Sequence, residues 1–158
     1  MEFFTTGVYN SAEEDFFSKL TENAIDTFAD IRQRRGVRGA RYSFANSRRL
    51  RQKLQDMGIR YEHVPGLAPT PEIRLLQKNS DKQGKTNKSK RMQLSDSFVQ
   101  AFKNEILPEF DFTGYIQQKQ EQGAGRIVFF CVEEFPEACH RSIVGDKLRS
   151  MGYNVTHL

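Results

Sequence analysis

The chain has 158 residues, a formal net charge of +4, and 28% charged and 37% hydrophobic residues, as expected for one globular domain large enough to bury a core. No apolar run approaches the ~20 residues of a membrane span, and the beginning of the chain lacks the basic region and long apolar core of a signal peptide. Two cysteines cannot form a disulfide framework, and a reducing compartment keeps them as thiols. We therefore expect a single cytoplasmic domain, residues 1–158, with no membrane partner.

Short apolar segments alternate with helical patterns along the whole chain. Apolar runs predict strands at residues 3–9, 25–31, 59–64, 127–130 and 153–157. Apolar residues at helical spacing predict helices at residues 16–24, 47–57, 98–107, 110–122 and 136–151. Strands that alternate with helices are typical of a layered α/β fold, so we predict a mainly parallel sheet flanked by helices.

Two basic segments interrupt this alternation. No acidic residue lies between Arg32 and Arg51, and a second basic run, residues 78–91, contains one acid, Asp81. Such runs can follow a phosphate backbone, although a single run is also typical of a solvated surface. Residues 77–97 lack aromatic side chains and are predicted to be a mobile insertion. The candidates for nucleic-acid contact lie in the first run and are Arg34, Arg35, Arg38, Arg41 and Tyr42. The tyrosine ring can stack on a base or anchor the loop to the core.

The stretch at residues 126–141, RIVFFCVEEFPEACHR, gathers the most varied chemistry in the chain. A buried strand ends near Phe130, and Pro136 suits the first turn of a helix. The polar and thiol groups around this junction are Cys131, Glu133, Cys139, His140 and Arg141. Ligands bind in open α/β sheets at the carboxyl ends of the strands, so we expect a site here.

Cys131 is the candidate for a reactive group. The thiolate form is favoured near a helix start and near arginines, which makes Cys131 a candidate nucleophile, with His140 and Glu133 moving protons. The alternative is that Cys131 is a small core residue, since unpaired cysteine is among the most buried residue types. Cys139, on the predicted helix, is expected to be a packing residue.

Arg32 and Arg141 are the candidates for an anion site. Their fork-shaped donors match phosphate oxygens, and the predicted helix start near Pro136 adds free N–H groups. Asp30 or Glu133 would hold one of the arginines in place. The rival interpretation is an internal ion-pair network, Asp30–Arg141 or Glu133–Arg32, that only ties strands together. Both interpretations require the second and fourth strands to be neighbours.

Metal binding is a further use for the sulfur and imidazole groups. Cys131, Cys139, His140 and His157 can supply such ligands. However, seven residues separate the cysteines and no CxxC pair occurs, so the spacing is not that of a zinc knuckle. Adjacent residues such as Cys139 and His140 point about 100° apart on a helix, which makes shared ligation awkward. We therefore predict no metal and no cofactor, and keep a small metal-binding structural protein as a third alternative.

Several short motifs occur in a fixed order along the chain. They are Thr6-Gly7 at the first strand, Asp30-Ile31-Arg32 after the second, Gly58-Ile59-Arg60-Tyr61, Leu67-Ala68-Pro69-Thr70, Cys131-x-Glu133, Pro136-x-x-Cys139-His140-Arg141 and the final Gly152-Tyr153-Asn154-Val155-Thr156-His157. In this set the chain resembles the domain-of-unknown-function family 488 nearly from end to end, and the C-x-E and P-x-x-C-H-R motifs are the specific part. The resemblance implies a Rossmann-like α/β domain and a nucleic-acid-related role, without a defined reaction. The chain departs from the family in its arginine-rich loop, residues 33–41, and its lysine-rich insertion, residues 77–91.

These patterns together predict an enzyme-like α/β domain that acts on a phosphate-bearing, nucleotide or nucleic-acid ligand. The groups expected to carry the chemistry are Cys131, Glu133 and His140, and those expected to form the anion site are Arg32, Arg141 and Asp30. The alternative is a non-catalytic nucleic-acid-binding module whose C-H-R cluster only braces the fold. The sequence leaves open whether the protein is an enzyme, and what its oligomeric state is.

Overall fold

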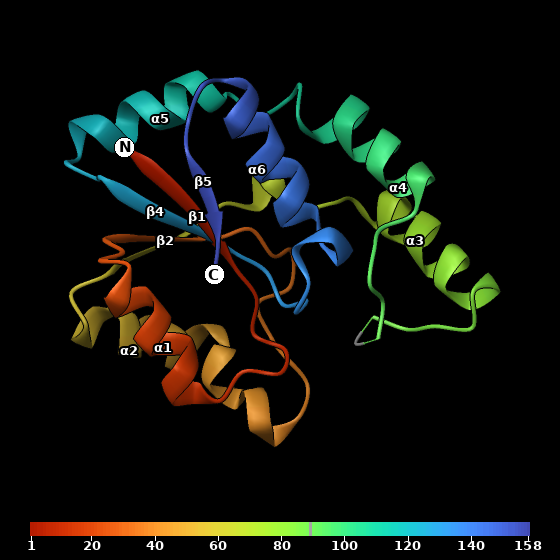
Figure 1. Ribbon diagram of the computed structural model, residues 1–158, viewed down its shortest axis with the longest axis horizontal. Helices are drawn as coiled ribbons and strands as arrows, with labels where there is room; N and C mark the ends of the chain where they lie inside the picture. The colour runs from red at the N-terminus through yellow and green to blue at the C-terminus, as the bar shows by residue number, and fades with distance from the viewer. Residues whose placement is uncertain (89) are drawn as a thin grey trace.

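The sheet is the framework of the molecule. The structure is a computed structural model that describes residues 1–88 and 90–158. In this part of the chain five parallel strands form one sheet in the order β3-β2-β4-β1-β5 (Figure 1). The strands are β1 Glu2–Thr6, β2 Thr27–Asp30, β3 Arg60–His63, β4 Arg126–Phe130 and β5 Val155–His157. The predicted parallel α/β sheet is confirmed, and its strand ends differ from the predicted ones by at most three residues.

Helices cover both faces of the sheet and one of its ends. The α-helices of the described chain are α1 Glu13–Glu22, α2 Ser47–Asp56, α3 Pro71–Gln83, α4 Asp96–Ala101, α5 Phe112–Glu121 and α6 His140–Ser150. In Figure 1, α1 and α2 lie on one face, whereas α5 and α6 lie on the other. Helices α3 and α4 pack on each other beyond the end of the sheet, close to the carboxyl ends of the strands (Figure 1).

This two-sided cover explains why the three central strands are largely buried. Every residue of β2 is buried, as are the last four residues of β1 and of β4. Below the sheet the ring of Phe16 on α1 contacts the rings of Phe28 and Phe130, at centroid distances of 6.3 and 5.6 Å. The core therefore fixes the ends of β2 and β4 from beneath.

The register of the central strands brings three chain segments to one edge. Asp30 at the end of β2 pairs with Phe130 at the end of β4, and Thr6 at the end of β1 pairs with the same residue. The second and fourth strands are thus neighbours, as the site predictions require. The residues that follow each strand emerge side by side.

One predicted helix start is wrong. Pro136–Ala138 forms a short 3-10 turn, and α6 begins at His140, after Cys139. Cys139 has extended backbone angles, φ −140° and ψ 142°, because it is the N-cap residue rather than part of the helix. The free N–H groups that were expected to bind an anion near Pro136 therefore belong to a short 3-10 turn and not to the first turn of a long helix.

The basic segment at residues 77–97 contains more regular structure than its composition predicts. Helix α3 continues to Gln83, α4 begins at Asp96, and the side chain of Arg91 is only 9% exposed. The mobility of this segment stays a prediction. In the described part of the chain we find no helix of the length and apolarity that crossing a membrane demands.

Candidate functional site

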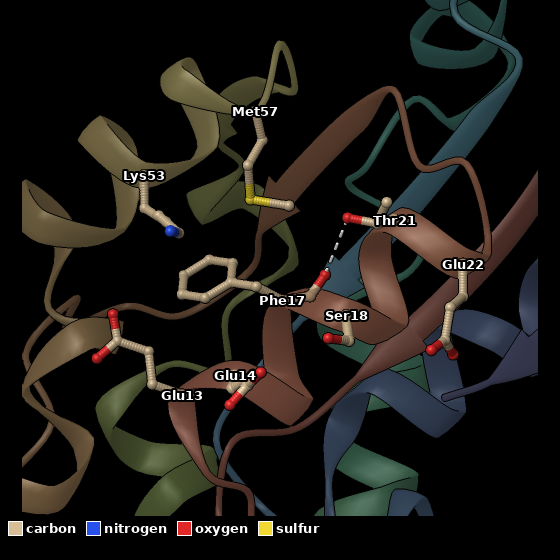
Figure 2. A pocket seen from close by; sticks show the side chains of 8 residues that line it. All are labelled: Glu13, Glu14, Phe17, Ser18, Thr21, Glu22, Lys53 and Met57. Atoms are coloured by element: carbon tan, nitrogen blue, oxygen red, sulfur yellow. Dashed lines mark hydrogen bonds between the residues drawn. The ribbon is translucent and has the colours of Figure 1, made fainter.

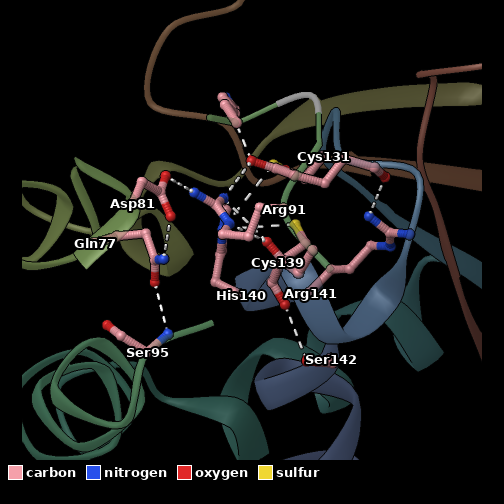
Figure 3. A network of polar contacts seen from close by, with 12 residues as sticks. Gln77, Asp81, Arg91, Ser95, Cys131, Cys139, His140, Arg141 and Ser142 are labelled. Carbon is pink, nitrogen blue, oxygen red and sulfur yellow. Dashed lines mark hydrogen bonds and ion pairs between the residues drawn. The ribbon is translucent and has the colours of Figure 1, made fainter. Parts of the chain in front are cut away.

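A cluster of sulfur, carboxylate and imidazole groups lies just beyond β4. The Cys131 thiol donates a hydrogen bond to Glu133 Oε2 at 3.3 Å. Nδ1 of His140 lies 4.0 Å from the Cys131 sulfur and 3.9 Å from the Cys139 sulfur (Figure 3). All four side chains are buried. The three residues predicted to carry the chemistry are thus in contact, and Cys139 lies among them rather than in the packing of a helix.

His140 is fixed in place on two sides. Its Nε2 lies 3.2 Å from the backbone carbonyl oxygen of Ile31, which follows β2. Its ring packs against Phe102, with centroids 5.5 Å apart. This contact reaches across β2 and β4, so the orientation of His140 depends on the pairing of these strands.

Arg91 covers the cluster from the side of α3 and α4. Its guanidinium donates to Glu133 Oε1 at 3.2 Å, to Asp81 Oδ2 at 2.8 Å and to the carbonyl oxygen of Ala138 at 3.0 Å (Figure 3). Asp81 also accepts a hydrogen bond from the Gln77 amide, at 2.7 Å. The ammonium group of Lys88, whose side chain is 55% exposed, lies 3.4 Å from Glu133 Oε1. Glu133 therefore has one oxygen facing cations and one facing Cys131.

Burial and close contact shift the pKa of each group in the cluster. The neighbouring Cys139 sulfur, and then burial, raise the pKa of Cys131 well above its ordinary value. Burial alone would raise the pKa of Cys139, but the neighbouring Cys131 thiol and the charge of His140 lower it well below its ordinary value. Burial opposes the charge on His140, whereas the negative sulfur of Cys139 raises the pKa of the imidazole. Burial and the same sulfur raise the pKa of Glu133. The two shifts run in opposite directions and favour Cys139 as the more acidic thiol, whereas sequence reasoning favoured Cys131.

The residues after β2 form a separate, closed ion pair. The Arg32 guanidinium donates to both carboxylate oxygens of Asp30, at 2.8 and 2.7 Å, and to the carbonyl oxygen of Ala45 at 3.0 Å. It also stacks on Phe130 at 4.5 Å. The Tyr61 hydroxyl donates to Asp30 at 2.9 Å. The ion pair joins Asp30 to Arg32 and not to Arg141, and Glu133 pairs with Arg91, so neither of the two pairs named in the rival interpretation forms.

Arg141 braces the backbone after β4. It is 1% exposed, and its two terminal nitrogens donate to the backbone carbonyl oxygens of Glu133 and Glu134. Its Nε has no hydrogen-bond partner within the described residues. Gly7 lies against the same backbone: a Cβ there would overlap the Glu133 carbonyl and lie 3.1 Å from Arg141 Nη1. Arg141 is absent from the lining of the cleft described next, whereas Arg32 is present.

A cleft of about 1010 Å³ opens above the cluster. Cys131, Glu133, Cys139 and His140 are among its lining residues, and Tyr9 lies at its edge. Its basic lining residues within the described chain are Arg32, Arg34, Arg38, Arg74, Lys78, Lys82, Lys88 and Arg91, and its acidic ones are Asp81 and Glu133. Both basic segments noted in the sequence thus contribute to one cleft.

The five candidates for nucleic-acid contact divide into two groups. Arg34 and Arg38 line the cleft, but Arg35, Arg41 and Tyr42 do not. The Tyr42 ring packs on Tyr9 at 5.3 Å, and its hydroxyl accepts a hydrogen bond from the backbone N–H of Asn10. This position agrees with the anchoring role considered for Tyr42.

A second cavity, of about 760 Å³, lies between α1 and α2 (Figure 2). Phe17 and Met57 form its apolar part, while Glu13, Glu14 and Lys53 form its rim (Figure 2). Neither a thiol nor an imidazole is among its described lining residues. Both thiols and the His140 imidazole line the cleft above β4 instead.

Sequence reasoning missed several residues of the site. Arg91 and Lys88 were noted only as part of a basic run, and Asp81 only as its single acid. That lone acid is the available signal, because an acid inside a basic run is often paired. The sequence offered no signal for Tyr9 beyond its place at the end of the first predicted strand.

Comparisons with known proteins identify a family but no individual relative. No curated protein and no solved structure matches the chain. The family model described as "Domain of unknown function DUF488" matches residues 12–148. This range holds β2, β3, β4 and the whole Cys131–Arg141 segment, so the predicted resemblance is confirmed. With the match covering most of the sequence, the chain belongs to the DUF488 family.

Proposed function

We propose that the protein binds a phosphate-bearing ligand, a nucleotide or a segment of nucleic acid, in the cleft above β4. The proposal extends to chemistry on that ligand by the groups at the floor, Cys131, Glu133 and His140. The observation that carries it is the charge of the cleft. Among the described lining residues eight are Lys or Arg and two are Asp or Glu, and both acids are already paired with Arg91.

The cations on the cleft walls are available to a ligand. Arg34, Arg38, Lys78 and Lys82 are exposed, and the described residues offer no hydrogen-bond or ion-pair partner for their side chains. Lysines and arginines without protein partners attract and neutralise phosphate groups. The two walls come from segments about 40 residues apart in the chain, which supports a shared ligand rather than a chance surface run.

The shape of the cleft favours a ligand larger than inorganic phosphate. Val37, Pro69, Pro71 and Leu75 add apolar surface to the same lining, and Leu75 is 52% exposed. Ligand sites typically combine apolar walls with a few polar groups that fix orientation. A nucleotide, with a flat base and a charged tail, matches this mixture.

Affinity for a fluorescent adenine nucleotide and a short single-stranded oligonucleotide, measured by anisotropy against salt, tests the binding. The double variant Arg38→Gln/Lys78→Gln removes one cation from each wall. The control Arg48→Gln/Lys103→Gln makes the same charge change at exposed residues outside the cleft lining. We expect the cleft variant to weaken binding at low salt and to reduce the salt slope by about 2 for the oligonucleotide. Equal affinities for the two variants, or no binding by the wild-type protein, would overturn the proposal.

Alkylation of the cysteines tests whether the ligand covers the floor. Bound nucleotide should slow the modification of Cys131 and Cys139 by a small alkylating reagent, followed by mass spectrometry of the native protein. An unchanged rate at saturating nucleotide would remove the floor from the proposed site.

The non-catalytic binding module is supported by one observation, the position of Arg141. Its contacts with two backbone carbonyls brace the fold, as that alternative expects for the C-H-R cluster. The variants Cys131→Ser and Glu133→Gln separate the two proposals. If both keep full nucleotide binding and no product of the ligand accumulates even with wild-type protein, the binding module is the better description.

A further inference from the structure

We propose that Cys131, Cys139 and His140 bind a single metal ion of the zinc class, with a fourth coordination position open to the cleft. Their two sulfur atoms and the ring nitrogen all lie within 4.8 Å of one another. The argument from helix geometry against shared ligation does not apply, because Cys139 precedes α6 in an extended conformation. The sulfur of this extended residue lies 3.9 Å from His140 Nδ1.

The separations are close to those that a tetrahedral ion requires. Zinc bound by thiolate at about 2.3 Å and by imidazole at about 2.0 Å needs sulfur–nitrogen separations of roughly 3.6 Å. The two sulfur–Nδ1 distances are 4.0 and 3.9 Å. The two sulfur–nitrogen distances therefore need to shorten by only a few tenths of an ångström for both groups to bind one ion, and the two sulfurs lie within 4.8 Å of each other.

The second nitrogen of His140 has the partner that metal-binding histidines use. Nε2 lies 3.2 Å from the Ile31 carbonyl oxygen, which can only accept, so Nε2 carries the hydrogen. The lone pair available for a metal is then on Nδ1, the atom that faces both sulfurs. Metal-binding histidines commonly donate their other N–H to a backbone carbonyl or a carboxylate, and this fixes the ring.

The charges of the site also suit a divalent cation. Two thiolates and a neutral imidazole balance a 2+ ion, so the buried cluster becomes neutral when it is occupied. The ligand set is soft sulfur with nitrogen, which favours zinc-class ions over calcium or magnesium. Within the described residues His157 is not part of this cluster; it is bonded to Thr5 Oγ1 at 2.6 Å instead.

Glu133 and the cleft define the fourth position. Glu133 Oε2 faces the Cys131 sulfur at 3.3 Å, while Oε1 is held by Arg91. Three protein ligands with one open position are typical of catalytic rather than structural zinc. The carboxylate beside that position is placed to bind the ion or to orient a bound water. Cys131 is then a ligand rather than a nucleophile. The metal site itself does not depend on the nucleotide proposal, which only supplies the substrate class.

Cobalt(II) substitution of the reduced wild-type protein tests the inference directly. We expect about one cobalt ion per chain, with near-ultraviolet sulfur-to-cobalt charge transfer and intense visible bands of a tetrahedral site, both removed by one equivalent of zinc. The variants Cys131→Ser, Cys139→Ser and His140→Gln should lose this spectrum. The matched control His157→Gln removes a histidine outside the cluster and should keep it.

The wild-type measurement needs no variant, so a variant that fails to fold leaves the test intact. Wild-type protein that shows no sulfur-to-cobalt band under reducing conditions overturns the inference. A band that survives in both Cys131→Ser and Cys139→Ser overturns it as well. The cleft variant Arg38→Gln/Lys78→Gln should keep the cobalt spectrum even if it loses nucleotide, so failure of the metal site and failure of the nucleotide proposal give different results.

Discussion

Two polar clusters lie side by side at the ends of β2 and β4, and they differ in how completely their groups are paired. After β2, Asp30 and Arg32 satisfy one another, with Tyr61 and a backbone carbonyl completing the contacts. After β4, each of two sulfurs lies about 4 Å from the same ring nitrogen, and of the two thiols only Cys131 has a carboxylate acceptor among the described residues. A saturated cluster stabilises the fold, whereas a cluster with unused ligand atoms can bind something else. Position at a strand end therefore does not define a binding site by itself. A binding site also needs ligand atoms that other groups of the protein do not already occupy.

The largest effect should come from breaking the saturated cluster. Asp30→Asn leaves the Arg32 charge buried without its carboxylate, so we expect the free energy of unfolding to fall by about 3 to 5 kcal/mol. Urea denaturation followed by circular dichroism measures the change. The control Asp56→Asn changes an exposed aspartate on α2 and should stay within about 0.5 kcal/mol of wild type. Equal losses for the two variants would contradict the assignment of Asp30–Arg32 as a structural pair.

The backbone between the clusters is the next most sensitive feature. Gly7→Ala places a methyl group on the Glu133 carbonyl and close to Arg141, and we expect a loss of about 1 to 3 kcal/mol from the displaced backbone. Gly36→Ala is the control, since its added carbon would meet only Asn46 Oδ1, at 3.8 Å. If Gly7→Ala is as stable as the control, the strand end has more freedom than the contacts indicate.

Removal of a carboxylate from the cluster after β4 should reduce stability less than its removal from the cluster after β2. Glu133→Gln removes a carboxylate from Arg91, but Arg91 keeps Asp81 and the Ala138 carbonyl, so we expect a loss of about 1 to 2 kcal/mol. Thermal and urea unfolding of the metal-free protein measure it beside the neighbouring variant Glu134→Gln, which changes an exposed carboxylate. A loss as large as that of Asp30→Asn would erase the difference between the two clusters.

The smallest effect concerns Tyr61 and appears only at high pH. Burial and then the charge of Asp30 raise the pKa of Tyr61 to about 12, above its ordinary value of 10.0. The protonated phenol therefore contributes stability that is fully present below about pH 10 and is lost as the pH rises through 12. Tyr61→Phe should cost about 1 kcal/mol at pH 7, through the lost hydrogen bond, and the difference from wild type should shrink between pH 10 and 12. Tyr153→Phe, which removes a phenol elsewhere, serves as the control; parallel pH curves for Tyr61→Phe and wild type would contradict the contact with Asp30.

The fold could be predicted from the sequence because the strands have a clear sequence pattern. Apolar runs such as 127–130 are short and bounded by polar residues, and alternation with helices leaves few other arrangements. The rule that ligands bind at the carboxyl ends of strands placed a candidate site at Cys131, Glu133 and His140, and these side chains do lie together. What could not be read was the conformation of Cys139, since one extended residue before α6 changes which sulfur faces which ring.

The roles of the arginines were also beyond the sequence. In the sequence, Arg32 and Arg141 were equivalent candidates for phosphate binding. In the structure the Arg32 guanidinium is paired with Asp30, and that of Arg141 donates its hydrogen bonds to backbone carbonyls. Arg91 is 42 residues from Glu133, and nothing in the local pattern links them. Such pairings depend on how α3 and α4 pack against the end of the sheet, which hydrophobic periodicity does not encode.

The strand order has a consequence for how the molecule forms. Strand β4 lies between β1 and β2 in the sheet, but it follows them by about 100 residues in the chain. During synthesis β1 and β2 have no strand to join them until residues 126–130 emerge, and such long-range pairings slow folding. The edges of both strands stay open through that interval, and open strand edges invite pairing with other chains. A truncated chain that stops before β4 should therefore aggregate rather than form a smaller sheet.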